Sequence, residues 1–82
     1  MSATKRKANE NKYNHWKETE DGGRVYQFEI KGRHNWKARY VKTVDKNENT
    51  LSFRQEIYNN ENELVEIHEK YPIDKGHKKL RR

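Results

Sequence analysis

Residues 24–44, RVYQFEIKGRHNWKARYVKTV, decide the fold. Apolar and polar residues alternate on both sides of a short polar connection, which is typical of strands that bury one face. The apolar positions are Tyr26, Phe28, Ile30, Trp36, Ala38, Tyr40 and Val44. Because the connection KGRHN is short and contains a glycine, the two strands are predicted to form an antiparallel hairpin. Trp36 is in register with the apolar positions and is therefore expected in the core.

Two further segments alternate in the same way, LSFRQEIY at 51–58 and ELVEIHEKY at 63–71. Leu64 interrupts the alternation and indicates a bulge or a strand packed on both faces. The residues expected to face inward are Leu51, Phe53, Ile57, Val65 and Ile67. The turns are short, and 24–71 has no room for crossover helices, so a parallel sheet is excluded. The sequence predicts a mainly β protein, an antiparallel four-stranded meander, and leaves open an open sheet or a small or half-open barrel.

The composition changes along the chain and predicts three parts. Residues 1–23 are a polar N-terminal segment, expected to be partly disordered, 24–71 form the sheet, and 72–82 are a basic tail. A four-stranded sheet leaves one apolar face uncovered. Segment 10–21, ENKYNHWKETED, is expected to cover it as a short helix or an added strand, with Trp16 as the anchor.

The composition also limits the function. Only 29% of the 82 residues are hydrophobic and 39% are charged, so the core should supply only about 3–5 kcal/mol, and a dimer, a ligand or a docked tail would add stability. Without cysteine, disulfides are excluded and a reducing cytoplasm is favoured. No signal peptide or membrane span is expected. Phosphate-loop, serine-hydrolase and metalloprotease motifs are absent from the sequence, and no cofactor is predicted.

The net charge of +6 is unevenly distributed. The stretch 31–42 and the tail are basic, whereas 45–69 is mostly acidic. The basic strand could pair with the acidic one across the sheet, or it could bind phosphates together with the tail. Trp36 at the basic turn would serve as a stacking platform if it were exposed. Our first hypothesis is a non-enzymatic module that binds RNA or another nucleic acid. The expected phosphate contacts are Lys31, Arg33, Lys37, Arg39, Lys75, Lys78, Lys79, Arg81 and Arg82.

Segment 66–80, EIHEKYPIDKGHKKL, concentrates the groups that carry acid–base chemistry. The candidate catalytic residues are His68, His77 and Tyr71, with His68 as a general base and Tyr71 or Lys78 stabilising a phosphate. Ligation of a divalent metal by His68, Asp74 and His77 is an alternative, but the spacing fits no standard zinc motif, so no metal site is predicted. The simplest interpretation is an exposed strand end.

The run YNNENELVEIHEKYPIDKGHKKL, about a quarter of the chain, resembles the C-terminal part of small prokaryotic β-sheet proteins of toxin–antitoxin systems. The resemblance is carried by a strand–turn–strand followed by Tyr71 and the pair Gly76-His77. Pro72-Ile73 stand where that family usually has Asp-Asn. The resemblance implies a ribonuclease-like or ribosome-directed activity, with His77 as the first candidate residue. The second hypothesis is thus a toxin-like ribonuclease, and the third is a protein-interaction module or homodimer.

The nucleic-acid hypothesis predicts that RNA affinity depends on salt concentration. RNA affinity should fall steeply with added salt, because phosphate contacts release counterions. Deletion of residues 75–82 should lower the affinity in a salt titration. An affinity that does not respond to salt would contradict the hypothesis.

Overall fold

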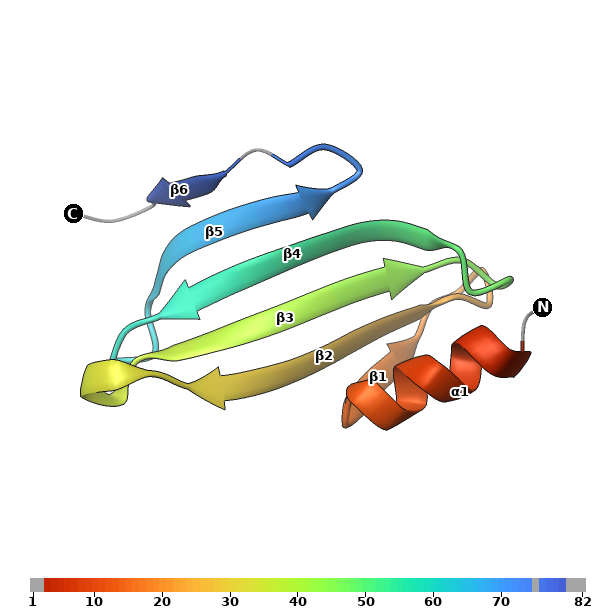
Figure 1. Cartoon of the computed structure of the whole chain (residues 1–82), viewed down its shortest axis with the longest axis horizontal. Coiled ribbons are helices and arrows are strands. Elements are labelled where there is room, and N and C mark those ends of the chain that lie inside the picture. Colours follow the sequence, from red (N-terminus) through yellow and green to blue (C-terminus); the bar gives the residue numbers. More distant parts are fainter. Residues whose placement is uncertain (1–2, 75, 80–82) are drawn as a thin grey trace.

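A computed structural model describes residues 3–74 and 76–79 as one open antiparallel sheet of six strands with one short helix. Figure 1 shows the strands side by side in chain order, with the helix near one end. The elements are α1 (Ala3–Lys12), β1 (His15–Glu18), β2 (Arg24–Lys31), the 3₁₀ turn η1 (Arg33–Asn35), β3 (Lys37–Val44), β4 (Thr50–Tyr58), β5 (Leu64–Tyr71) and β6 (His77–Lys79). No helix among the described residues is long and apolar enough to cross a membrane.

The predicted antiparallel meander is confirmed, but the number of strands was wrong. The two additional strands, β1 and β6, lie at the two edges of the sheet. They contain four and three residues, all exposed, so neither has the apolar alternation that reveals a strand in the sequence. They form by pairing with β2 and β5. The sheet does not close, so the barrel alternative is set aside.

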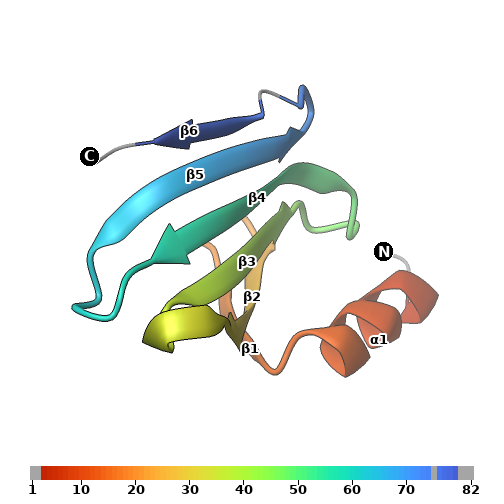
Figure 2. The ribbon, with the colours of Figure 1, turned by 60° about the vertical axis from the view of Figure 1, so that its left-hand side comes forward.

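The strand register separates two faces of the sheet. The helix face carries Tyr26, Phe28 and their cross-strand partners Lys42 and Tyr40, and Lys42 is in turn opposite Phe53. The charged face carries the row Glu29, Arg39, Glu56, Ile67 and Lys78. Figure 2 shows α1 on one side of the twisted sheet, and no helix of the described part of the chain lies on the other.

A small aromatic core lies on the helix face. Tyr13, Tyr26 and Val44 are buried, and Phe28, Tyr40 and Phe53 pack against them. Tyr13 follows directly after α1, and its ring centroid lies 5.6 Å from that of Tyr26 and 5.2 Å from that of Phe28. The N-terminal segment therefore does cover the sheet, but its anchor is Tyr13, which is 1% exposed, and not Trp16, which is 38% exposed. Trp16 belongs to the edge strand β1, where its ring contacts Tyr26 from the rim.

Three other residues predicted to face the core are exposed: Ile30, which is 51% exposed near the end of β2, Trp36 and Leu51. Trp36 lies outside β3 because His34 and Asn35 adopt left-handed backbone conformations and the strand begins only at Lys37. Leu51 is 49% exposed. It lies in a bulge, because Thr43 pairs with Ser52 whereas Val44 pairs with Thr50.

A bulge also explains why one of the two β5 residues predicted to face inward, Ile67, does not lie on the helix face. A bulge between the Tyr58–Leu64 and Ile57–Glu66 pairs confirms the irregularity expected at Leu64 and leaves Val65 buried. After the bulge, Ile67 pairs with Glu56 on the charged face. His68 pairs with Gln55, so it lies on the helix face and not on the side opposite the core.

One buried carboxylate fastens α1 to the sheet. Glu48 lies in the β3–β4 turn, and its side chain is fully buried. It accepts hydrogen bonds from Arg6 Nε at 3.1 Å, Asn9 Nδ2 at 3.0 Å and the Tyr26 hydroxyl at 2.8 Å. Burial raises the pKa of Glu48, but the hydrogen bonds from Asn9, Tyr26 and Arg6 outweigh it and hold the pKa below its ordinary value. The carboxylate is thus ionised and links two residues of the helix to the core.

Glu48→Gln should therefore destabilise the fold, by about 1–3 kcal/mol at pH 7, because one buried hydrogen-bond acceptor becomes a donor group. Since the folded-state pKa is lowered, the stabilisation is present above the ordinary pKa of 4.5 and is lost as the pH falls through the folded-state value. Urea unfolding at several pH values measures both effects. The exposed Glu61→Gln variant is the control. An E48Q protein as stable as E61Q, with the same acid dependence, would contradict the assignment.

Candidate nucleic-acid interface

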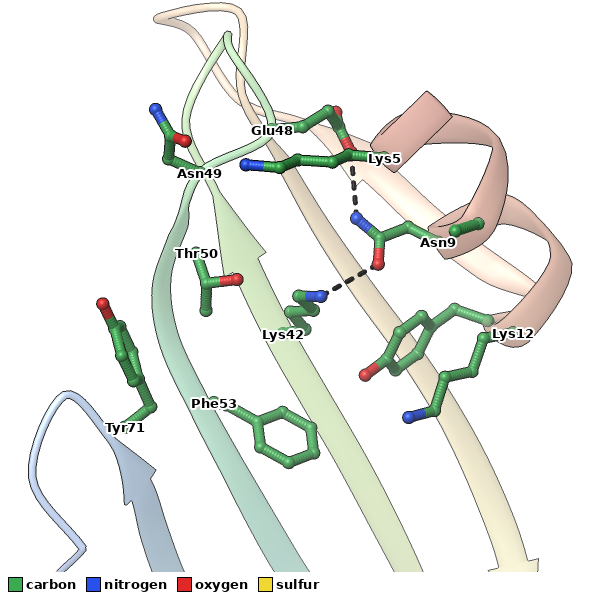
Figure 3. A pocket seen from close by; sticks show the side chains of 11 residues that line it. Lys5, Asn9, Lys12, Lys42, Glu48, Asn49, Thr50, Phe53 and Tyr71 are labelled. Atoms are coloured by element: carbon green, nitrogen blue, oxygen red, sulfur yellow. Dashed lines mark hydrogen bonds between the residues drawn. The ribbon is translucent and has the colours of Figure 1, made fainter. Parts of the chain in front are cut away.

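A groove of about 810 Å³ lies on the helix face between α1 and the ends of β4 and β5. Figure 3 shows the helix on one side of it and Tyr71 on the other, with Phe53 and Lys42 between them. The lining residues are Lys5, Ala8, Asn9, Lys12, Tyr13, Lys42, Glu48, Asn49, Thr50, Phe53 and Tyr71. The groove therefore combines amines with aromatic rings.

Lysine amines approach the groove from several sides. Lys5 and Lys12 come from α1, and Lys42 comes from the middle of β3 (Figure 3). Lys42 Nζ donates to the side-chain oxygen of Asn9 at 2.9 Å, which is a neutral partner. Glu48 is the only acid in the lining, and its carboxylate already accepts three hydrogen bonds. Among residues 3–74 and 76–79, neither Lys12 nor Lys42 forms an ion pair with a carboxylate.

The environment of Lys42 leaves the positive charge of the groove only partly balanced. Burial lowers the pKa of the Lys42 amine, and repulsion from Lys12 and Lys5 lowers it further, although Glu48 acts in the opposite direction. A partly buried, positively charged amine that is repelled by its neighbours is stabilised when an anion binds beside it. The groove is thus suited to a phosphate or another small anionic group.

Aromatic side chains form the wall on the β5 side of the groove. Phe53 and Tyr71 are partners in the β4–β5 register, and Tyr71 is 48% exposed. Next to them, Lys70 Nζ lies 5.6 Å from the ring centroid of Tyr40 and 5.9 Å from that of Phe53. Another amine therefore lies beside the groove, on the same face.

The basic residues predicted from the sequence lie elsewhere. On the charged face, Arg39 pairs with Glu29 at 2.6 Å, and Lys37 lies 3.9 Å from the same carboxylate. This is the complementary pairing considered as the alternative to a binding patch. Lys31 and Arg33 are exposed near the β2–β3 connection, and Lys78 and Lys79 are exposed on β6. Lys75, Arg81 and Arg82 lie outside the described residues.

The fold brings two of the candidate catalytic residues together. His68 and His77 are cross-strand partners with ring centroids 4.5 Å apart. His68 Nε2 lies 2.5 Å from Asp74 Oδ1, and its Nδ1 is buried without a hydrogen-bond partner. His77 Nδ1 lies 3.3 Å from Glu66. Since one nitrogen of His68 is engaged and the other is buried, this ring is poorly placed to exchange a proton with a substrate.

Tyr71, the third catalytic candidate, lines the groove with the lysines. Among the described residues, no group of three or more histidine, aspartate and glutamate side chains is placed to hold a metal ion. The histidine pair and the groove are thus separate features of the helix face.

The groove lysines were missed because they become neighbours only when α1 docks on the sheet. A signal was nevertheless present in the sequence. Lys5, Asn9 and Lys12 have the spacing i, i+4 and i+7, which places three side chains on one side of a helix.

Comparison of the chain with protein-family models, curated proteins and solved structures gave no match. The toxin-like resemblance of the C-terminal run therefore stays a prediction, and the site is interpreted from its own geometry.

The pKa of Lys42 should be measurably low in the free protein and should respond to its neighbours. Lys12→Gln should raise it toward the ordinary value of 10.5, because one source of repulsion is removed. Side-chain carbon NMR followed against pH measures this value. Lys31→Gln, which removes the same charge on the charged face, should leave it unchanged. Equal effects of the two variants would show that the lysines do not form a local cluster.

Proposed function

We propose that this protein binds nucleic acid, RNA first of all, through the groove on the helix face. The observation that carries the proposal is the convergence of Lys5, Lys12 and Lys42 on a groove lined by aromatic rings. Lysine ammonium groups bind phosphate as point charges, and aromatic rings stack on bases. A nucleic acid provides both partners at a regular spacing, whereas an acidic peptide would provide only the charges.

The distribution of charge over the two faces supports binding on the helix face. On the charged face, Arg39 and Lys37 share Glu29, and Arg54 pairs with Glu56 at 2.7 Å. The two charges of each ion pair neutralise one another, so these pairs attract a polyanion only weakly. On the helix face, Lys70 extends the amines of the groove toward the middle of the sheet.

The ribonuclease alternative is less well supported by the geometry. Acid–base cleavage of RNA needs two groups that reach the substrate together. The hydrogen bond and burial of His68 leave only His77 of the histidine pair accessible, and Tyr71 lines the separate groove. We therefore propose binding without cleavage.

The test is the salt dependence of RNA binding in matched charge variants. Lys12→Gln should lower affinity for a short single-stranded RNA several-fold at low salt. It should also reduce the slope of log affinity against log salt by about 0.7, the value for one lost phosphate contact. Fluorescence anisotropy at several salt concentrations measures both quantities.

Lys31→Gln is the matched control, since it removes one charge from the set that the sequence favoured. Its slope should stay that of the wild type. If Lys31→Gln reduces the slope and Lys12→Gln does not, the RNA lies on the charged face. Affinity that is independent of salt in all three proteins would refute a nucleic-acid function and favour a protein partner.

A further inference from the structure

The geometry of the groove points to a binding slot for one unpaired nucleotide, with its base on the half-exposed ring of Tyr71 and its phosphate on Lys42 and Lys12. This inference rests on the proposed function and adds to it the class of nucleic acid, namely single strands. It follows from the order of the aromatic rings across the sheet, the position of the amines and the size of the groove.

The aromatic rings on the helix face form a stack that ends at the groove. Phe28 and Tyr40 stack with centroids 4.9 Å apart and planes 17° apart, and Tyr40 and Phe53 follow at 6.2 Å and 20°. Tyr40 thus has a ring on each side. Phe53 is the last ring of the row, and in Figure 3 it extends toward the helix side of the groove, away from Tyr71.

Lys70 lies beside this row of rings. Its Nζ lies at nearly the same distance from the Tyr40 centroid as from the Phe53 centroid, 5.6 and 5.9 Å. A point about equally far from two stacked rings lies over the rim between them. Tyr71 extends from β5 as the opposite wall of the groove, and its half-exposed ring offers a face on which a base can stack.

The amines lie where a phosphate joined to such a base would be. Figure 3 shows Lys42 above Phe53 on the floor of the groove, with Lys12 on the helix side. Lys42 uses one donor on Asn9, and an ammonium group has three donors, so two remain for phosphate oxygens. The hydroxyl of Thr50 also lines this part of the groove.

The slot selects single strands because stacking needs a free base face. In a duplex both faces of each base are covered by neighbouring pairs, so entry of a base requires unpairing. A volume of about 810 Å³ lies within the range of small-ligand pockets, which is large enough for one nucleotide. Aromatic stacking tolerates every base, so little sequence preference is expected.

The experiment compares a five-nucleotide single-stranded RNA with a duplex of the same sequence in one salt buffer. The wild type should bind the single strand at least about tenfold more tightly than the duplex. Tyr71→Ala should weaken binding of the single strand about tenfold, the size of one base–aromatic stacking contact. Tyr71→Phe should retain the affinity, because the ring is kept.

Two further variants make the result specific. Tyr71→Leu keeps an apolar side chain without a planar ring and should bind as weakly as Tyr71→Ala. Ile73→Ala truncates an exposed side chain nearby, 66% exposed and not part of the groove lining, and should bind like the wild type. Amide NMR spectra show that each variant is folded.

The outcomes separate the slot from the proposed function. If neither RNA binds, the proposed function fails. If both RNAs bind with equal affinity and Tyr71→Ala binds like the wild type, the protein binds nucleic acid but the slot is wrong. If Tyr71→Leu retains full affinity, Tyr71 acts by bulk and the stacking role is refuted.

Discussion

The structure depends on the buried carboxylate of Glu48. It lies in a turn, yet it is bound by Arg6, Asn9 and Tyr26, which come from the helix and from the second strand. A buried charge is costly unless every lone pair has a partner, and here the partners are the groups that fix α1. Docking of the helix in turn carries Tyr13 into the core and brings Lys5 and Lys12 to the groove. Fold and candidate site thus share one interaction.

The two faces of the sheet use charge in different ways. On the charged face, acidic and basic side chains alternate across the strands and neutralise one another, as in Glu29, Arg39 and Glu56. On the helix face, Lys42 is partly buried and donates to the neutral amide of Asn9, and the amine of Lys70 lies near the aromatic ring of Tyr40. Attraction for an anion is therefore concentrated where the charge is least compensated, and not where basic residues are most dense in the sequence, at 75–82.

The sequence predicts the elements that form by burial of one strand face, but not those that depend on pairing between distant segments. The four central strands were predicted because alternation with period two directly reflects burial of one face. The turn before β5 has a left-handed residue at Asn62, a conformation that asparagine tolerates. The bulge at Leu64–Val65 was signalled by the break in alternation, but the edge strands and the bulge at Leu51 were missed because they depend on pairing between strands, which composition does not encode. The groove was missed for the same reason, since Lys42 and Lys12 meet only in three dimensions.

The two edges of the sheet also determine how the molecule behaves when many copies gather. An open sheet offers unpaired backbone groups at both sides, and neighbouring chains can add to them as further strands. Here the outermost strands have only four and three residues and carry Lys17, Glu18, Lys78 and Lys79. Short, charged borders discourage growth from one chain to the next. Copies crowded along a polyanion would thus stay separate and remain free to dissociate one by one.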